Sequence, residues 1–408
     1  MKAILALAVL ALTAAPMADS AAQTTIIRVA GAWDGSRVIE HVTIAIENGK
    51  ITSIGPGTIK APKGARKIDA RRYSAIPGLI DLHTHITYYW DRKPGTRPLG
   101  QRRNPSVTVF LAQDNLKRTL ETGVTTVRDL GAASDMDYAL RELVATGHMT
   151  GPRIVAAGQG ISAARGGPNP DAMRQLAETR IKAGSDWVKV YGSRGSFQSV
   201  DTTQTVTFDE MKAIVDAAHA LGHKVAIHSY GASGVRDAVR AGADSVEHGI
   251  EIDDETFAEM VRRGTVWVPT IDHNRYYVDA RDEYGFAPET IPPLEDYIQK
   301  NLEATRRAIA AGVKIGMGSD AVYTMFGQNT RELAWFVKAG MTPEQALATA
   351  TTVPADLLGL SSTLGRLAPG CAADLVLVDG DPTKNIDAVV SHVVLVMKDG
   401  VVVVDRTR

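Results

Sequence analysis

The chain has 408 residues, of which 44% are hydrophobic and 22% are charged, with a formal net charge of −1. This composition is that of a globular protein, long enough for one large domain or two smaller ones. The near-zero net charge, with no block of Lys and Arg, argues against proteins that bind nucleic acid or an anionic membrane.

The first 22 residues are typical of a cleaved secretory signal. Lys2 supplies positive charge, Ile4 to Leu12 form an apolar run, and Ser20-Ala21-Ala22 places small residues before a cut at Gln23. The apolar run is too short to span a bilayer, and a buried N-terminal helix is the alternative interpretation. We therefore expect residues 1–22 to be removed and the mature protein, which then has no membrane anchor, to be periplasmic or secreted.

Short strands with tight turns are predicted from residue 23 to residue 75. Thr25 to Ala30, Val42 to Glu47 and Lys50 to Ile54 are apolar or alternating runs. Asn48-Gly49, between the last two runs, is a hairpin signal.

From residue 76 to residue 362, eight short apolar runs alternate with amphipathic segments. The runs are Ile76–Leu82, Thr125–Leu130, Arg153–Ala157, Trp187–Tyr191, Lys224–Ile227, Ser245–Glu247, Thr265–Val268 and Lys314–Met317. Eight βα units in about 285 residues predict a TIM (β/α)8 barrel, which is an α/β fold. A doubly wound sheet is the structural alternative, but the chain contains no G-x-G-x-x-G or Walker A sequence.

Strand-like composition returns between residues 363 and 408. Asp374 to Val378 and Val393 to Met397 are β-branched runs, and Lys398-Asp399-Gly400 is a turn. We expect the two chain ends to form one small β-domain, with the barrel inserted between them.

Six polar side chains lie at the carboxyl ends of the inferred barrel strands, where TIM barrels place their active sites. His83 and His85 end the first strand, and residues two apart project to the same face. Lys189 lies in the apolar fourth strand, where a buried ammonium would be costly. Strands five, six and eight end at the remaining three, His228, His248 and Asp320. A single H-x-H pair is weak evidence, but the convergence of all six residues favours a metal site.

The first barrel strand resembles that of the amidohydrolase superfamily, in the segment Ile76-Pro77-Gly78-Leu79-Ile80-Asp81-Leu82-His83-Thr84-His85. The segments Ile46–Ile51 and Leu367–Val376 resemble the β-sandwich of that superfamily. Within it, the chain is most similar to the imidazolonepropionase-like and prolidase-like branch, which includes zinc dipeptidases and an ochratoxin-type amidase. The resemblance covers almost the whole mature chain. It implies a (β/α)8 barrel with a small β-sandwich built from both chain ends.

The resemblance also implies two divalent metal ions, most simply Zn²⁺, although Mn²⁺ and Fe²⁺ fit the same donors. His83, His85 and Asp320 would bind the more buried ion. The second ion would be bound by the remaining pair, His228 and His248. Lys189 would be N6-carboxylated by CO₂, so that its new oxygen atoms bridge the ions. Asp320 would be the catalytic residue, which takes a proton from the shared water and passes it to the leaving group.

Four further residues are candidates for substrate binding: Tyr191, Arg194, Arg165 and His273. Tyr191 shares the inward-facing side of strand four. Arg194 and Arg165 lie in glycine-containing loops on the catalytic face, where a guanidinium could bind a carboxylate, although a solvated arginine is the alternative. His273 follows strand seven, in a long and aromatic segment, 271–293, that is either a lid loop or packed structure.

Hydrolysis of the C–N amide bond in dipeptides or N-acyl amino acids, by a hydroxide that bridges the two ions, is the leading functional hypothesis. The partner is then a small amide or peptide, and the resemblance suggests a homo-oligomer. A lactonase, or a cyclic-amide or imidazolone hydrolase on the same site, is the alternative, because a fold does not choose among these reactions. Many relatives carry Gly-Gly-His where this chain has Gly166-Gly167-Pro168, which weakens the transfer of any one relative's specificity. A non-catalytic binding protein is disfavoured because all six ligand positions are present.

Overall fold

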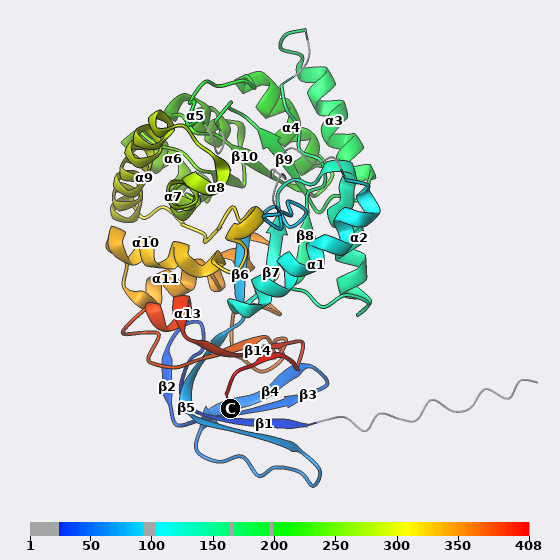
Figure 1. Cartoon of the computed structure of the whole chain (residues 1–408), viewed down its shortest axis with the longest axis vertical. Coiled ribbons are helices and arrows are strands. Elements are labelled where there is room, and N and C mark those ends of the chain that lie inside the picture. The colour runs from blue at the N-terminus through cyan, green and yellow to red at the C-terminus, as the bar shows by residue number, and fades with distance from the viewer. Residues whose placement is uncertain (1–23, 94–102, 164–165, 196–198, 408) are drawn as a thin grey trace, which may run out of the picture.

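The structure, a computed structural model, describes residues 24–93, 103–163, 166–195 and 199–407. The predicted secretory signal at residues 1–22 and the candidate Arg165 lie outside the described residues. Among the helices of these ranges, none combines the length and the hydropathy that crossing a bilayer requires. A β-sheet region lies below a larger region of helices and parallel strands in Figure 1.

Strands from both chain ends form one sheet, which lies in the lower part of Figure 1. They are β1 (Thr25–Trp33), β2 (Val38–Glu40), β3 (Val42–Glu47), β4 (Lys50–Pro56), β5 (Arg66–Pro77), β13 (Leu375–Val378), β14 (Val393–Lys398) and β15 (Val401–Asp405). The order is β15-β14-β13-β5-β1-β3-β4, and β2 pairs with β1. The chain ends meet where β5 pairs antiparallel with β13, with Leu375 opposite Pro77. The predicted joining of the two ends in β-structure is therefore confirmed.

The hairpin between β3 and β4 forms where the sequence predicts it. Asn48 and Gly49 have φ values of 51° and 73°, which are the left-handed values that a type I′ turn needs at both central positions. A Cβ atom on Gly49 would lie 2.7 Å from the carbonyl oxygen of Asp399. Glycine here therefore also lets the C-terminal turn pack against the N-terminal hairpin.

Two parallel sheets make up the centre of the larger region. One contains β6 (Leu79–Thr84), β7 (Val124–Asp129) and β8 (Arg153–Ala156). The other contains β9 (Trp187–Tyr191), β10 (Lys224–His228), β11 (Ser245–Glu247) and β12 (Val266–Val268). Three isolated parallel bridges link the sheets in a circular order: Ile161 with Val190, Trp267 with Ile315, and Thr84 with Ala321.

The eighth predicted run, Lys314–Met317, is not a regular strand. It belongs to a segment that the bridges hold between β12 and β6. The amide of Met317 donates to the carbonyl oxygen of Thr349, outside the ring of strands, at 2.7 Å. The amide of Met317 is therefore not available to a neighbouring strand. The segment keeps its place in the ring through the bridges, but without the regular pairing of a strand.

Helices surround the ring of parallel strands (Figure 1). They are α1 (Pro105–Glu121), α2 (Met136–Ala145), α3 (Pro170–Lys182), α4 (Phe208–Ala220), α5 (Ala232–Ala241), α6 (Asp254–Arg263), α7 (Ile271–Asp279), α8 (Arg281–Tyr284), α9 (Ile291–Ala311), α10 (Glu332–Ala339), α11 (Pro343–Thr349), α12 (Thr352–Leu357) and α13 (Asp387–Ser391), with short 3-10 turns at Ala133–Asp135, Pro288–Thr290, Tyr323–Met325 and Asn329–Arg331. Helix α4 shows why such segments fold: Thr207 and Glu210 form a capping box, and Met211 and Ile214 are buried on one face.

The segment 271–293, for which the sequence allowed a lid loop, is largely helical. Helix α7 covers its first part, and α8 and the start of α9 follow. The carboxyl group of Glu332 accepts from the backbone N–H groups of Ile271 and Asp272, each at 2.8 Å. These are N–H groups that have no partner within the helix. Glu332, which is far from α7 along the chain, therefore stabilises the start of this helix. The local sequence of the segment does not indicate this contact.

Candidate metal centre

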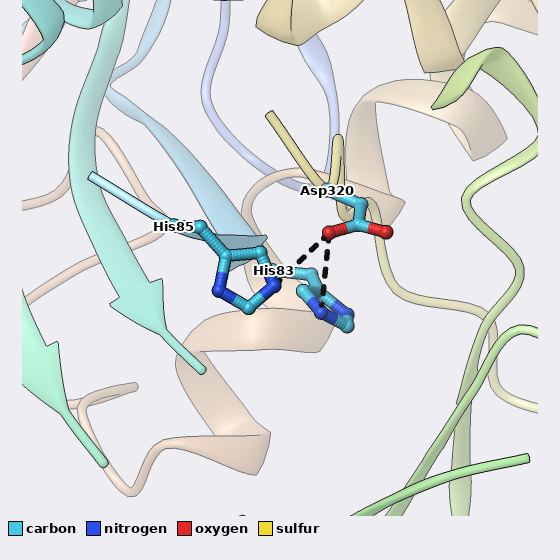
Figure 2. A group of neighbouring side chains, drawn as sticks. All are labelled: His83, His85 and Asp320. Carbon is cyan, nitrogen blue, oxygen red and sulfur yellow. Dashed lines mark ion pairs between the residues drawn. The ribbon is translucent and has the colours of Figure 1, made fainter. Parts of the chain in front are cut away.

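Three potential metal ligands meet at the carboxyl end of β6 (Figure 2). Nε2 of His85 lies 3.2 Å, and Nε2 of His83 lies 3.5 Å, from Oδ1 of Asp320. One ligand atom from each residue lies within 4.8 Å of those of the other two. All three side chains are buried, so an ion among them would be shielded from solvent.

Hydrogen bonds from β6 place Asp320 beside the two histidines. The amide of Asp320 donates to the carbonyl oxygen of His83 at 2.7 Å. The carboxylate of Asp81 accepts from the amide of His83 at 3.1 Å and from the hydroxyl of Ser319 at 2.6 Å. Asp81 therefore ties the end of β6 to the segment that carries Asp320. Asp320 itself has a φ of 50°, an uncommon conformation for a residue other than glycine.

The other three predicted ligands line the same cavity. The ring centroid of His248 lies 5.1 Å from that of His83 and 4.6 Å from that of His228. Lys189 reaches the cavity from β9. The cavity has a volume of about 250 Å³ and is lined by His83, His85, Tyr88, Lys189, Tyr191, Gly195, His228, Tyr230, His248, His273, Tyr277, Asp320, Val322 and Tyr323. The structure thus brings together all six residues that the sequence indicated as ligands.

Lys189 has an unusual environment for an amine. Its side chain is buried, and its Nζ atom has no hydrogen-bond partner in the described part of the chain. Burial lowers the pKa of Lys189 to about 8, against the opposing charges of Glu247 and Asp320. A buried amine without a partner is costly, whereas an amine converted into a metal ligand would have partners. Nζ of Lys189 thus lies in one cavity with the four imidazoles and the carboxylate of the other predicted ligands. This arrangement indicates that the residues fit metal ions.

Each of the four imidazoles among the predicted ligands also contacts a group that is not itself a predicted ligand. The contacts join His83 to Glu247 at 2.9 Å, His85 to the carbonyl oxygen of Gly131 at 3.1 Å, His248 to the hydroxyl of Thr270 at 2.6 Å, and His228 to the backbone of Gly195. Partners of this kind orient metal-binding histidines. Burial, followed by the charge of Lys189, lowers the pKa of His83 to about 4. The ring is therefore uncharged at neutral pH, as a metal ligand must be.

Tyr191 extends from the end of β9 into the cavity, as its position two residues after Lys189 predicts. Two glycines make room for its ring. A Cβ atom on Gly131 would lie 2.4 Å from the hydroxyl oxygen of Tyr191, and one on Gly160 would lie 2.5 Å from its Cε2 atom. Glycine at both positions therefore allows this tyrosine to stand beside the ligands.

The three remaining candidates differ in their placement. His273 lines the cavity and belongs to α7, not to a loop. Arg194 is exposed and does not line the cavity, and its charge lowers the pKa of Asp201, after the hydrogen bonds from Thr203. The structure therefore does not bring Arg194 to the ligands. Arg165 lies outside the described residues, so its role stays a prediction.

An aromatic wall, formed by Tyr88, Tyr277 and Tyr323, borders the cavity. The ring of Tyr88 stacks on His85 at a centroid distance of 4.8 Å and on Tyr323 at 5.7 Å. Tyr277 meets His273 edge to face at 4.8 Å. The sequence analysis did not identify Tyr323, which follows Asp320 in a 3-10 turn that no periodic pattern indicates.

Tyr230 is a second cavity residue that the sequence analysis missed. Its ring lies 5.1 Å from that of His228 and 5.0 Å from that of His248. It follows His228 by two residues, as Tyr191 follows Lys189. The same spacing argument could therefore have found it.

Comparison with known proteins places this geometry in a family. Residues 74–403 match the Amidohydrolase family. The crystal structure of a Xaa-Pro dipeptidase with methionine bound in its active site is 30% identical, with a TM-score of 0.84, and the match covers 93% of this chain and 99% of that one. The ochratoxinase of Aspergillus niger is 26% identical over 353 residues, which are 76% of this chain and 71% of that protein. An imidazolonepropionase of Geobacillus thermodenitrificans is 26% identical over 91% of this chain and 92% of its own length.

Proposed function

The chain belongs to the amidohydrolase family, and on that premise we propose that it hydrolyses the amide bond of dipeptides or N-acyl amino acids at a site for two divalent metal ions. The observation that carries this proposal is the cavity in which all six ligand-type residues meet around the unpartnered Nζ of Lys189. The circular order of the parallel strands supports a (β/α)8 barrel as the fold that holds them.

Two groups of residues would hold the ions, most simply Zn²⁺. His83, His85 and Asp320 would hold one, and the second would be held by His228 and His248. Lys189 would contribute to both after N6-carboxylation. In that reaction the amine attacks CO₂, an N–C bond forms and one proton is released. The lowered pKa of Lys189 favours the free amine that this reaction needs.

Bound ions would lower the pKa of a water molecule and polarise the scissile carbonyl. The chain's own contribution is a base and a shaped cavity. Burial alone would raise the pKa of Asp320, but the neighbouring His273 and His83 hold this pKa well below its usual value. Asp320 is thus a carboxylate that can accept the proton of the attacking water and pass it to the leaving nitrogen.

The cavity suits a small substrate with an apolar side chain. Its volume of about 250 Å³ is near the lower end of the range for ligand pockets, ~300–1,000 Å³. The aromatic wall of Tyr88, Tyr277 and Tyr323 offers contact area beside the ligands. The Xaa-Pro dipeptidase with bound methionine supports a peptide or amino-acid derivative.

A cyclic-amide hydrolase is the second candidate, because the similarity to imidazolonepropionase extends over 91% of this chain. A lactonase would use the same residues. A non-catalytic binding protein remains disfavoured, because none of the six ligand positions is lost. We also propose export with removal of residues 1–22, and assembly into a homo-oligomer, which light scattering on the purified protein would test.

The test of the proposed reaction uses the protein from residue 23 onward, loaded with Zn²⁺. Amine release is measured from dipeptides and N-acyl amino acids, with lactones and cyclic amides alongside and Asp320→Asn as the background. Turnover of amides that is lost in the variant supports the proposal. Turnover of lactones or cyclic amides alone would replace it with the corresponding alternative, and no turnover by a metal-loaded protein would favour a binding role.

A further inference from the structure

A buried cation lies beneath the ligand cluster. Arg128, in β7, has no exposed side-chain surface. Its guanidinium donates to the carbonyl oxygen of Leu82 at 2.7 Å, to the hydroxyl of Ser245 at 2.9 Å and to Oε1 of Glu247 at 2.8 Å. Its Cζ atom also lies 4.5 Å from the ring centroid of Trp187. Arg128 therefore crosses from β7 to β11 with all three guanidinium nitrogen atoms hydrogen-bonded and one face against Trp187.

Stability alone does not explain this ion pair. Removing two charges from water is expensive, and apolar residues of similar size often replace a buried ion pair without loss of stability. Arg128 and Glu247 are both fully buried. A role beyond packing is therefore expected of them, and the contacts of Glu247 indicate which one.

Glu247 divides its two oxygen atoms between two neighbours. Oε1 accepts from Arg128, and from the hydroxyl of Ser245 at 2.5 Å. Oε2 lies 2.9 Å from Nδ1 of His83. Because a carboxylate can only accept, Nδ1 must carry the hydrogen in this contact. In a neutral imidazole Nε2 then has the free lone pair, and Nε2 is the atom that lies 3.5 Å from Oδ1 of Asp320.

His83 differs in this respect from the other three histidines among the predicted ligands. His85 contacts a backbone carbonyl, His248 a threonine hydroxyl, and His228 the backbone of Gly195. Among these four contacts, only that of His83 is with a carboxylate. A carboxylate acceptor fixes the tautomer of a histidine ligand and raises its basicity more than a neutral oxygen does.

We propose that Arg128 and Glu247 are positioning residues for metal binding: Arg128 holds Glu247 in place through Oε1, and Glu247 holds His83 with Nε2 free for a metal ion. This inference rests on the proposed function only in that the cavity binds metal. Neither residue touches the metal or the substrate.

Glu247→Gln tests the proposal because it keeps the shape of the side chain and removes its charge. With its oxygen held by Arg128 and Ser245, the amide would present NH₂ to Nδ1 of His83, and this favours the tautomer with hydrogen on Nε2. We expect a fall in metal affinity of about 10- to 100-fold, the range for such outer partners, measured by competition with a chelator and by the metal content after dialysis. The control is Arg153→Met, which removes different ion pairs, with Asp374 and Asp399, away from the cavity.

The double variant Arg128→Met/Glu247→Met separates the positioning role from a purely structural one. It leaves neither charge unpaired, so it folds even if Glu247→Gln does not. We expect it to melt no lower than the wild type without metal, yet to lose metal affinity as Glu247→Gln does. Wild-type affinity in either folded variant would overturn the proposal. A wild type that binds two ions but cleaves no amide would refute the proposed reaction and leave this test in force, whereas a wild type that binds no metal refutes both.

Discussion

Both ring nitrogen atoms of His273 face the same residue, Asp320. Nδ1 lies 2.9 Å from its backbone oxygen, and Nε2 lies 3.3 Å from Oδ2. Since Oδ1 of Asp320 faces His83 and His85, the two oxygen atoms of the carboxylate point to different imidazoles. Because a carbonyl oxygen can only accept, Nδ1 donates in the first contact, and His273 anchors the backbone of the residue that we propose as the base.

Loss of this support should slow turnover more than it weakens substrate binding. We expect His273→Ala to lower kcat by about 10- to 100-fold, the range for residues that orient a metal ligand, with a small change in KM. Steady-state kinetics on the best amide substrate measures both. His148→Ala removes an exposed histidine and serves as the control. Equal losses in the two variants would contradict the role of His273.

Lys189→Met should have opposite effects on metal binding and on the stability of the metal-free protein. The change removes the amine that we expect to be carboxylated, so fewer than two ions should remain bound after dialysis. It also removes a buried Nζ that has no hydrogen-bond partner among the described residues. The free energy of unfolding without metal should therefore rise by about 1–3 kcal/mol. Metal analysis and urea unfolding test the two parts separately, and a variant that keeps two ions would refute the bridging role.

The stability of the protein should depend on pH through Glu332. Burial raises the pKa of Glu332 to about 8, although the N–H groups of Asp272 and Ile271 oppose this, while the pKa in the unfolded chain is ~4.3. Between these pH values the folded state keeps a proton that the unfolded chain releases. The free energy of unfolding therefore falls as pH rises, by up to about 1.4 kcal/mol per unit. This contribution is complete below about pH 4.3 and lost above about pH 8.

Glu332→Gln isolates that contribution because glutamine stays neutral. Urea unfolding of both proteins from pH 5 to pH 8 should show the variant gaining stability relative to the wild type as pH rises. Parallel pH dependences of the two proteins would show that Glu332 has an ordinary pKa.

The aromatic wall should select for the side chain of the substrate. Tyr323→Leu removes one ring that lines the cavity and stacks on Tyr88. Because such contacts contribute ~0.5–1.5 kcal/mol, kcat/KM should fall about 2- to 10-fold for a dipeptide that contains phenylalanine. A dipeptide of alanine in the same variant is the control. An equal fall for both substrates would assign Tyr323 to packing.

Export predicts a defined mature N-terminus. Expression of the full chain in a bacterium with a periplasm should yield exported protein that begins at Gln23, as N-terminal sequencing or intact mass would show. Replacement of Leu7 by Arg within the apolar run should retain the protein in the cytoplasm, because the run would no longer serve as a secretory signal. Uncleaved protein in both cases would favour a buried N-terminal helix.

The six candidate ligands could be predicted because their signals are local. His83 and His85 share one face of a strand, and Lys189 interrupts an apolar strand. The carboxyl ends of parallel strands in a barrel gather at one mouth, so residues from several strands could be placed together before any contact was known. Two predictions were less accurate: a regular eighth strand and a possible lid loop at 271–293. Hydrogen bonds to distant residues, Thr349 and Glu332, shape those segments.

The sequence by itself thus determined the set of candidate ligands, the joining of the two chain ends in β-structure and the family. Only the tertiary structure decided which partner each ligand has. Glu247 appears in the sequence as the residue before His248, yet its side chain contacts His83 and Arg128. His273 meets Asp320 from α7, a helix whose first turn is held by the carboxyl group of the distant Glu332. These contacts join strands and helices that are far apart along the chain, and their geometry depends on packing that no short pattern encodes.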